Sequence, residues 1–170
     1  MPDPRESAVL VPLFRDAADR LRVVIVRRAA GGFHGGQLAF PGGKRETADA
    51  SLLDTALREA YEEIGLPPAS VEVIEALPVL HTTTIGLHIA PFLALIARPA
   101  AWTPDPHEIA EVLEPAVADL VRDEGLESFA GWPAPRRVEF FRVGPHRLWG
   151  ATYRILAPLV PRLLAGDWPV

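Results

Sequence analysis

The sequence of 170 residues predicts an α+β fold, which we expect to form one domain over residues 1–170. Three observations support this prediction. Runs rich in β-branched and apolar residues recur along the chain, an amphipathic helix interrupts them, and an apolar helical segment lies near the C-terminus. Hydrophobic residues make up 49% of the chain, which is enough to bury a core and too much for a disordered protein.

The expected strands are short and are separated by turn-forming residues. A turn over residues 15–20 joins the first two, and Thr82-Thr83-Thr84-Ile85-Gly86 separates two later β-rich runs. We expect a short helix over residues 115–122, an irregular Gly- and Pro-rich loop over residues 123–137, and a last helix over residues 149–164 that tolerates its prolines or kinks at them. The expected strands are residues 8–14, 21–28, 37–40, 71–80, 88–97, 108–113 and 138–143.

Residues 49–64 predict an amphipathic helix. Asp49 is its expected N-cap, Gly65 suits the position after its last turn, and Pro67-Pro68 prevent its continuation. At about 100° per residue, the apolar side chains form one stripe and the acidic ones lie to one side of it. The helix can therefore pack on a sheet while its carboxylates face outward. The stripe consists of Leu53, Ala56, Leu57, Ala60 and Ile64.

Three carboxylates gather on this helix. Glu59, Glu62 and Glu63 stand at i, i+3 and i+4, where like charges repel one another. A bound divalent cation would offset the repulsion, and a solvated acidic face is the alternative. The residues before the helix favour the metal site. Phe40-Pro41-Gly42-Gly43 ends an apolar segment and opens a loop whose glycines allow close backbone approach to a ligand.

Residues 43–66 resemble the Nudix box, which has a glycine, a loop, an acidic residue and a helix with the pattern Arg-Glu-apolar-x-Glu-Glu-x-Gly-apolar. Residues 58–66 match this pattern at every defined position. The first half departs from it, because the chain has one extra residue before Arg58 and because Asp49 fills the acidic position in place of glutamate. The resemblance implies a Nudix-like mixed β-sheet flanked by helices, as an α/β/α sandwich, and a metal-dependent pyrophosphohydrolase.

A second resemblance points to the coenzyme A pyrophosphatase branch of that family. Gly36-Gln37-Leu38-Ala39-Phe40-Pro41-Gly42-Gly43 resembles the branch's Gly-Gln-Val-x-Phe-Pro-Gly-Gly. Arg27 and His34 stand where its signature has an Arg and a His, and Trp149-Gly150-Ala151-Thr152 resembles a Trp-Gly-x-Thr that begins its last helix. The signature also carries a second arginine where this chain has Gly32. That departure bears on coenzyme A specificity and leaves the hydrolase class intact.

The box residues suit divalent-metal chemistry. Carboxylate oxygens are hard ligands that favour Mg²⁺ or Mn²⁺, and such an ion would bridge phosphate oxygens and stabilise the charge that develops during hydrolysis. Glu59 and Glu63, one helical turn apart, are the expected ligand pair. Glu62 would hold a second ion or orient a bound water, and the carbonyl of Gly43 or of the glycine before it would complete the shell. Arg58 is expected to position the carboxylates by ion pairing.

The general base is expected from a box glutamate or from an acidic residue in a later loop, as the family resemblance implies. Glu108 is our candidate for the second option, because it begins an apolar-alternating segment within a proline-rich loop. A solvated loop carboxylate is an equally good interpretation of Glu108. Glu111 is a weaker candidate for the same role.

Contacts to substrate would come from cationic and aromatic residues near the box. Coenzyme A carries a 3′-phosphate and a diphosphate, which cations can bind. Taken singly, each cationic candidate is more often a surface charge, and for His34 a ligand role and a turn role are equally compatible with the sequence. Trp132 and Trp149 could stack on adenine, although a core or dimer role is favoured. The cationic candidates are Arg27, Arg28, Lys44 and Arg45.

The leading hypothesis is hydrolysis of a diphosphate bond in a nucleoside diphosphate derivative, with coenzyme A or an acyl-coenzyme A giving 3′,5′-ADP and a 4′-phosphopantetheine. The alternatives are a Nudix pyrophosphatase acting on ADP-ribose or an oxidised nucleotide and, less favoured because three box carboxylates are kept, a nucleotide-binding module without turnover. Incubation with Mg²⁺ and a panel of these compounds would separate them.

Composition limits the partners. The net charge of −5 disfavours non-specific binding to nucleic acid and to anionic membranes. The N-terminal segment Met1-Pro2-Asp3-Pro4-Arg5-Glu6 does not resemble a signal peptide, and no apolar run reaches the length of a membrane span. The sequence has no cysteine, which is compatible with a reducing cytoplasm. A homodimer is expected by family analogy.

Overall fold

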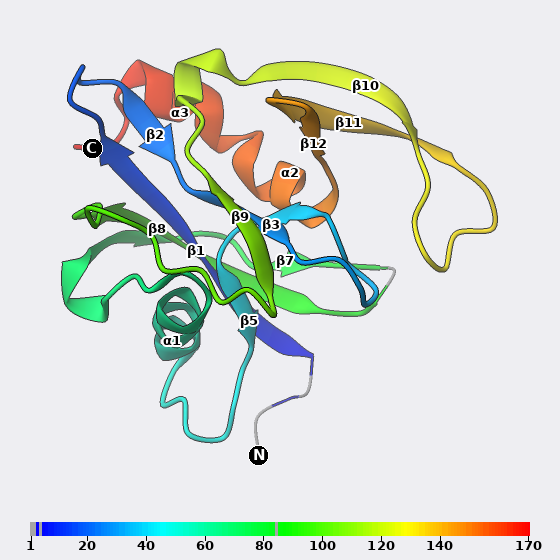
Figure 1. Ribbon diagram of the computed structural model, residues 1–170, viewed down its shortest axis with the longest axis horizontal. Coiled ribbons are helices and arrows are strands. Elements are labelled where there is room, and N and C mark those ends of the chain that lie inside the picture. The colour runs from blue at the N-terminus through cyan, green and yellow to red at the C-terminus, as the bar shows by residue number, and fades with distance from the viewer. Residues whose placement is uncertain (1–2, 4, 84) are drawn as a thin grey trace.

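The computed structural model describes residue 3, residues 5–83 and residues 85–170. Thr84, which belongs to the predicted turn, and Met1, Pro2 and Pro4, which belong to the N-terminal segment, lie outside the described residues. In Figure 1, α1 lies on one side of a central strand, β1, and the C-terminal helices lie on the other side. The helices are α1 (Leu52–Ile64), α2 (Gly150–Leu156) and α3 (Leu159–Ala165), and η1 (Pro68–Ser70) and η2 (Val117–Asp119) are short 3₁₀ turns.

The strands form one mixed sheet and two small antiparallel sheets. In the mixed sheet, β1 runs parallel to β8 and antiparallel to β2 and β5, and β8 also pairs with β6 and β7. Its strands are β1 (Glu6–Arg15), β2 (Leu21–Val23), β5 (Gly42–Lys44), β6 (Val71–Ala76), β7 (Leu80–His81) and β8 (His88–Ile96). The small sheets have the orders β4-β3-β9, with β3 (Ile25–Arg28), β4 (Leu38–Ala39) and β9 (Ile109–Leu113), and β10-β11-β12, with β10 (Val121–Glu127), β11 (Arg136–Val143) and β12 (His146–Leu148).

Strand β1 is buried on both faces, so its alternating side chains enter two separate cores. Val11 and Leu13 pack in a cluster that includes residues of α2 and α3. Ala8 and Leu10 pack in a second cluster with the apolar face of α1. A strand whose two faces are both covered by helices places the sheet in the middle of three layers. The predicted α+β class and the Nudix-like mixed sheet flanked by helices are therefore confirmed.

The start of α1 differs from the prediction. Ser51, not Asp49, is the N-cap, and its hydroxyl accepts a hydrogen bond of 3.1 Å from the backbone N–H of Asp54. Asp49 is unavailable for capping because its carboxylate is occupied by Arg58 and by the hydroxyl of Thr55. The predicted end of the helix is correct, since Gly65 takes a left-handed conformation with φ of 72°.

Several strand boundaries also differ from the prediction. Val24 separates the expected strand over residues 21–28 into β2 and β3, which belong to different sheets. The glycine pair that was expected to open a loop forms β5, paired with β1. The last helix is interrupted at residues 157–158, next to Pro158, which cannot donate a backbone hydrogen bond.

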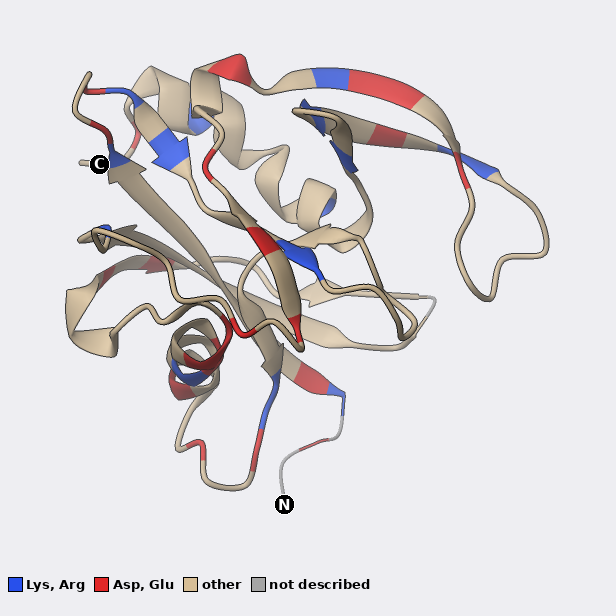
Figure 2. Ribbon diagram, viewed as in Figure 1, with Lys and Arg blue, Asp and Glu red and all other residues tan. Residues whose placement is uncertain are grey.

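The irregular loop expected over residues 123–137 is correct only for residues 128–135. Residues 123–127 and 136–137 instead belong to strands β10 and β11, whose hairpin projects from the body of the protein (Figure 1). Both strands carry basic and acidic residues, as the coloured bands of Figure 2 show, and some of them pair across the strands. Arg137 contacts Glu124 at 2.6 Å, and Arg142 contacts Asp123. Because charge pairs rather than an apolar stripe accompany β10, its sequence lacked the usual strand pattern, whereas most of β11 was predicted as the strand over residues 138–143.

Candidate metal and active site

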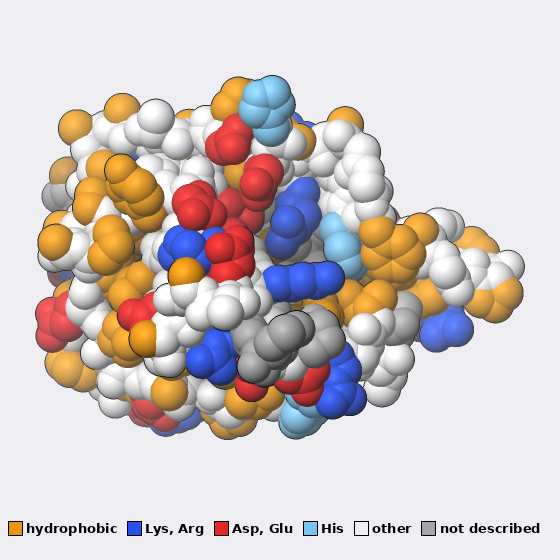
Figure 3. All heavy atoms as spheres, turned by 90° about the horizontal axis from the view of Figure 1, so that it is seen from below, with side chains coloured by type: hydrophobic (Ala, Val, Ile, Leu, Met, Phe, Trp, Pro, Cys, Tyr) orange, Lys and Arg blue, Asp and Glu red, His pale blue; other side chains and the backbone are white. Residues whose placement is uncertain are grey.

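Three carboxylates from two separate elements meet beside α1. Glu59 and Glu63 stand one turn apart on the helix, and Glu108 lies immediately before β9. One carboxylate oxygen from each residue lies within 4.8 Å of the other two. Figure 3 shows a group of acidic side chains on this face of the molecule, with basic side chains next to it. Oxygen ligands at such spacing fit a hard divalent cation such as Mg²⁺ or Mn²⁺.

Glu63 is the most deeply placed of the three carboxylates. Only 1% of its surface is exposed, and its Oε2 accepts a hydrogen bond of 3.1 Å from the backbone N–H of Gly42. Burial is the main cause that raises the pKa of the Glu63 carboxyl to about 7, and the negative charges of Glu59 and Glu108 act in the same direction, whereas the positive charge of Arg28 opposes them. Burial also raises the pKa of Glu59. A cation would offset this concentration of charge, so the residues fit the metal that the sequence predicts.

The glycine pair of β5 makes room for these carboxylates. A Cβ atom at Gly43 would overlap the carboxylate of Glu59, and a Cβ atom at Gly42 would overlap the backbone of Ala8 and Val9 in β1. Gly42 also has a φ of 158°. The missing side chain at Gly43 therefore lets the helix carboxylates approach β5, and the missing side chain at Gly42 lets β5 pair closely with β1. The predicted role of the Gly43 carbonyl as a metal ligand stays a prediction.

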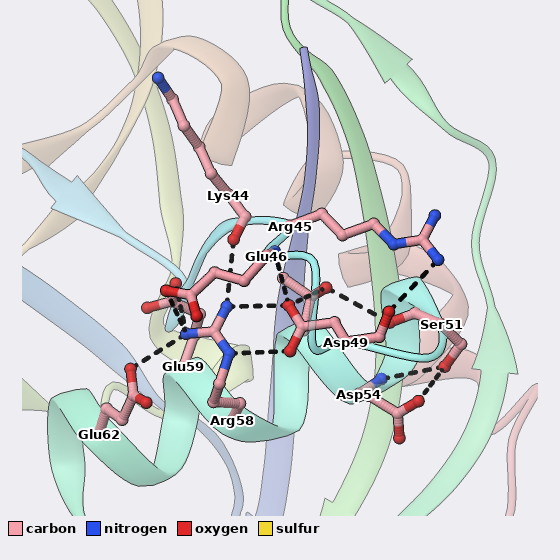
Figure 4. Close-up of polar contacts among 10 residues, drawn as sticks. Lys44, Arg45, Glu46, Asp49, Ser51, Asp54, Arg58, Glu59 and Glu62 are labelled. Carbon is pink, nitrogen blue, oxygen red and sulfur yellow. Dashed lines mark hydrogen bonds and ion pairs between the residues drawn. The ribbon is translucent and has the colours of Figure 1, made fainter. Parts of the chain in front are cut away.

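Arg58 lies at the centre of a network that connects the loop to the helix (Figure 4). Its guanidinium donates to both carboxylate oxygens of Asp49, at 2.9 and 3.0 Å, and to the carbonyl of Lys44 at 3.1 Å. It also donates to Glu59 and Glu62, each at 3.1 Å. The hydrogen bonds from Arg58 hold the pKa of Asp49 well below its usual range, and those to Asp49 raise the pKa of Arg58. This geometry suits the positioning role expected for Arg58.

Glu62 has a different environment from its two neighbours on the helix. Its side chain is 56% exposed, and its carboxylate contacts the Arg58 guanidinium rather than the group formed by Glu59, Glu63 and Glu108. The predicted role of Glu62 at a second ion or a bound water stays a prediction.

Glu108 is fixed to the rest of the site by backbone hydrogen bonds. The N–H of Ala29 donates to the Glu108 carbonyl at 2.7 Å, and the N–H of Asp105 donates to the Glu63 carbonyl at 2.9 Å. The loop before β9 is thereby attached both to the end of β3 and to the end of α1. The sequence offered Glu108 as a general base, and the structure adds that it lies among the expected ligands. No spacing in the sequence relates it to Glu59, so its place as a third carboxylate was missed.

The cationic candidates occupy different surroundings. Arg27 contacts Glu111 at 3.1 Å, so both of these predicted site residues are engaged with each other. Arg45 contacts Glu6 at 3.1 Å and donates to the Ala50 carbonyl at 3.2 Å, which joins the loop to the start of β1. The exposed Lys44 extends its ammonium group away from the Arg58 network (Figure 4).

The loop after β3 carries the remaining candidates. His34 shares a hydrogen bond of 3.0 Å with Gln37 through its Nδ1 and packs against Phe33 and Phe129. Gly32, where the branch signature has an arginine, has a φ of 69° with open space around it. A side chain there would fit in space but would strain the backbone. The left-handed backbone at residue 32 therefore favours glycine over arginine, which is consistent with the absence of the arginine here.

Residues 4–132 match the family model described as the NUDIX domain. The chain belongs to the Nudix family. Two relatives named "Uncharacterized Nudix hydrolase NudL" agree with this assignment. The protein of Pectobacterium atrosepticum is 40% identical over 111 residues, which cover 65% of this chain and 56% of the relative. The protein of Citrobacter koseri is 37% identical over 150 residues, which cover 88% of this chain and 72% of the relative. These matches support assignment of this Nudix chain as a pyrophosphohydrolase.

Solved structures show the same Nudix fold. The Nudix hydrolase RenU of M. smegmatis superposes with a TM-score of 0.68 at 16% identity, covering 98% of this chain and 89% of that one. The NUDIX domain of Shewanella oneidensis NrtR, solved in complex with ADP ribose, superposes with a TM-score of 0.55 at 21% identity, covering 70% of this chain and 77% of that one. Within the part of this Nudix chain that the structure describes, no helix has both the length and the apolar character needed to cross a membrane.

Proposed function

We propose that this Nudix chain hydrolyses the diphosphate bond of a nucleoside diphosphate derivative, with coenzyme A or an acyl-coenzyme A as the favoured substrate. The observation that supports the proposal most is the group of carboxylate oxygens from Glu59, Glu63 and Glu108, which lie within 4.8 Å of one another. Water adds to one phosphorus atom and the bridging P–O bond breaks, so coenzyme A gives 3′,5′-ADP and 4′-phosphopantetheine.

The three carboxylates would hold Mg²⁺ or Mn²⁺. A bound ion of this kind would neutralise charge on the diphosphate and polarise its oxygens. Arg58 supports the site by holding Glu59 in place through a bond of 3.1 Å, while its bonds to Asp49 fix its own orientation. Glu108, in a loop that is attached to both α1 and β3, is suited to accept a proton from the attacking water or to contact the metal.

Coenzyme A is favoured because residues 36–43 resemble the run found in the coenzyme A pyrophosphatase branch. Arg28 is the last residue of β3, next to Arg27, and its positive charge lowers the pKa of the Glu63 carboxyl. It is therefore the described cationic candidate best suited to contact the substrate's phosphates. Gly32, where the branch has its second arginine, has a left-handed backbone that suits glycine, so the proposal assigns no phosphate contact to this position.

The test is a turnover assay in Mg²⁺ with coenzyme A, acetyl-coenzyme A, ADP-ribose and 8-oxo-dGTP, in which products are identified by mass. We expect 3′,5′-ADP and a phosphopantetheine from the first two, and no turnover by the Glu63→Gln variant. Faster turnover of ADP-ribose, the ligand in the NrtR complex, would make ADP-ribose the favoured substrate in place of coenzyme A. Tight binding without turnover of any of them would indicate a binding module.

The cellular setting and the assembly belong to the same proposal. We infer that this enzyme is cytoplasmic, which the absence of cysteine supports, and that it forms a homodimer, by analogy with the family. Sedimentation of the purified protein at several concentrations would test the dimer, and a species with the mass of one chain throughout would reject it.

A further inference from the structure

Five aromatic rings from three separate segments meet one another, and we refer to them as the aromatic cluster. Phe129 is at its centre, with ring centroids 4.6 Å from Phe33, 5.4 Å from His34, and 5.7 Å from both Trp132 and Trp149. Phe33 and His34 belong to the loop after β3. Phe129 and Trp132 belong to the connection between β10 and β11, and Trp149 directly precedes α2.

The loop after β3 connects this cluster to the segment that carries Glu108. Its first residue, Ala29, donates to the Glu108 carbonyl at 2.7 Å. Phe33 follows only four residues later, so it lies within about 14 Å of Ala29 even if the chain between them is fully extended. In Figure 3, acidic side chains, then basic ones, then a histidine and hydrophobic side chains follow one another across this face towards the projecting hairpin. Acidic, basic and hydrophobic side chains thus share a single face of the molecule.

The cluster has features that a purely structural core would avoid. Phe33 is 45% exposed although it contacts another ring. The Nε1–H of Trp132 is buried and, among the residues that the structure describes, has no hydrogen-bond acceptor. A tryptophan N–H in this setting normally finds a partner, because leaving it without one is unfavourable. Exposed ring surface and an unused donor in one place are features of a site for a planar, polar ring.

We propose that the aromatic cluster binds the nucleobase of the substrate, with stacking on the rings and an acceptor for Trp132 Nε1–H. The proposal deepens the proposed function, since it takes from it only that the ligand is a nucleoside diphosphate derivative. Arg28 directly precedes Ala29, which bonds to the Glu108 backbone, and Phe33 follows in the same loop, so groups suited to the metal, the phosphates and the base lie on neighbouring segments. Stacking tolerates any base because every base has a π-face. The pantetheine arm of coenzyme A has no ring and would extend elsewhere.

Tryptophan fluorescence offers a test with a matched control. The chain has four tryptophans, of which two, Trp132 and Trp149, belong to the cluster. One double variant, Trp102→Phe with Trp168→Phe, leaves only the cluster tryptophans. The opposite double variant, Trp132→Phe with Trp149→Phe, leaves only the two outside it. ADP in Mg²⁺ should quench the first protein and leave the second unchanged. Quenching of the second protein alone would overturn the proposal.

A second test measures, by calorimetry, the affinity of cluster variants for ADP and for inorganic pyrophosphate. Trp132→Leu should weaken ADP binding about tenfold and leave binding of inorganic pyrophosphate, which lacks a base, unchanged. Phe33→Leu should act in the same direction and is expected to fold, because its ring is partly exposed. Equal weakening of both probes, or unchanged ADP binding in both variants, would refute a base site. Weaker binding of 4′-phosphopantetheine instead of ADP would assign the rings to the other end of the substrate and would also refute it.

The two proposals fail separately. If the wild-type protein hydrolyses a diphosphate substrate but the cluster tryptophans do not respond to ADP, the hydrolase stands and the base site is rejected. If ADP quenches those tryptophans and no compound is turned over, the base site stands and the hydrolase is rejected.

Discussion

Arg58 donates two hydrogen bonds to the Asp49 carboxylate across the loop that precedes α1. Its Nε lies 2.9 Å from Oδ1 and its Nη2 lies 3.0 Å from Oδ2. The carboxylate is nearly fully buried, and the guanidinium is mostly buried. The fork geometry of this pair is specific to arginine, because lysine presents a single nitrogen. The pair fixes both the path of the loop and the guanidinium that contacts Glu59.

We expect Arg58→Lys to lower the free energy of unfolding by about 3 kcal/mol, since it leaves a buried carboxylate short of donors. It should also reduce kcat, because Glu59 loses its contact. Urea unfolding and steady-state turnover are the measurements. Arg98→Lys is the control, because Arg98 contacts Glu114 away from the site. Equal effects of the two substitutions would contradict a special role for the Arg58–Asp49 pair.

The Asp49 carboxyl should give an acid-dependent contribution to stability. Its pKa is depressed in the folded protein, chiefly by the hydrogen bonds from Arg58, and returns to about 3.8 in the unfolded chain. Its contribution is therefore complete above about pH 5 and is lost as the pH falls below 4. The difference in unfolding free energy between wild type and Asp49→Asn should be constant from pH 5 to 7 and shrink below pH 4. A difference that does not change with pH would show that the charge of Asp49 is unimportant.

Glu63→Gln should stabilise the metal-free protein while abolishing turnover. The pKa of Glu63 rises to about 7 in the folded state, so its contribution to stability is complete below about pH 4.5 and is lost as the pH rises through 7. At pH 8 the charged form costs on the order of 3 kcal/mol. Glutamine keeps an acceptor for the Gly42 amide and removes that cost. Thermal melting in EDTA at pH 8 is the measurement, and Glu72→Gln on the exposed face of β6 is the control. A lower melting temperature for Glu63→Gln would refute the argument.

Gly43→Ala should weaken Mn²⁺ binding at least tenfold, because the new methyl group would occupy the position of the Glu59 carboxylate. The backbone at Gly43 does not have a positive φ, so the substitution tests the close approach alone. Electron paramagnetic resonance titration of Mn²⁺ measures the affinity. Gly125→Ala is the matched control, since its nearest contact would be at 3.4 Å. Unchanged Mn²⁺ affinity in Gly43→Ala would exclude Glu59 as a ligand.

The sequence predicted the parts of the site that depend on local pattern. Glu59 and Glu63 follow from helical periodicity, and the need for glycine at residue 43 follows from the pattern before the helix. The place of Glu108 depends on how the loop before β9 docks on α1, which no local spacing encodes. Asp49 was predicted as an N-cap because its type and position suit one. Ser51 caps the helix instead, because the carboxylate of Asp49 accepts hydrogen bonds from Arg58 and Thr55.

The fold shows the same division. The α+β class and the buried strands were predictable, because apolar residues mark them. Strand β10 was not, because its residues meet those of β11 as charge pairs, whereas most of β11 was predicted as the strand over residues 138–143. The aromatic cluster was equally hidden, since its rings come from three segments that are distant in sequence.

The attachment of Glu108 has one more consequence. Its carboxylate belongs to a loop that follows the whole of β6 to β8, whereas Glu59 and Glu63 belong to the helix that precedes them. An ion shared by the three would act as a reversible crosslink between these distant parts of the chain. Only the folded protein brings the three oxygens together, so such an ion must shift the unfolding equilibrium towards the native state as its concentration rises. The resistance of this enzyme to heat and proteolysis would then depend on the concentration of divalent cations. The same bound ion would serve both catalysis and the stability of the fold.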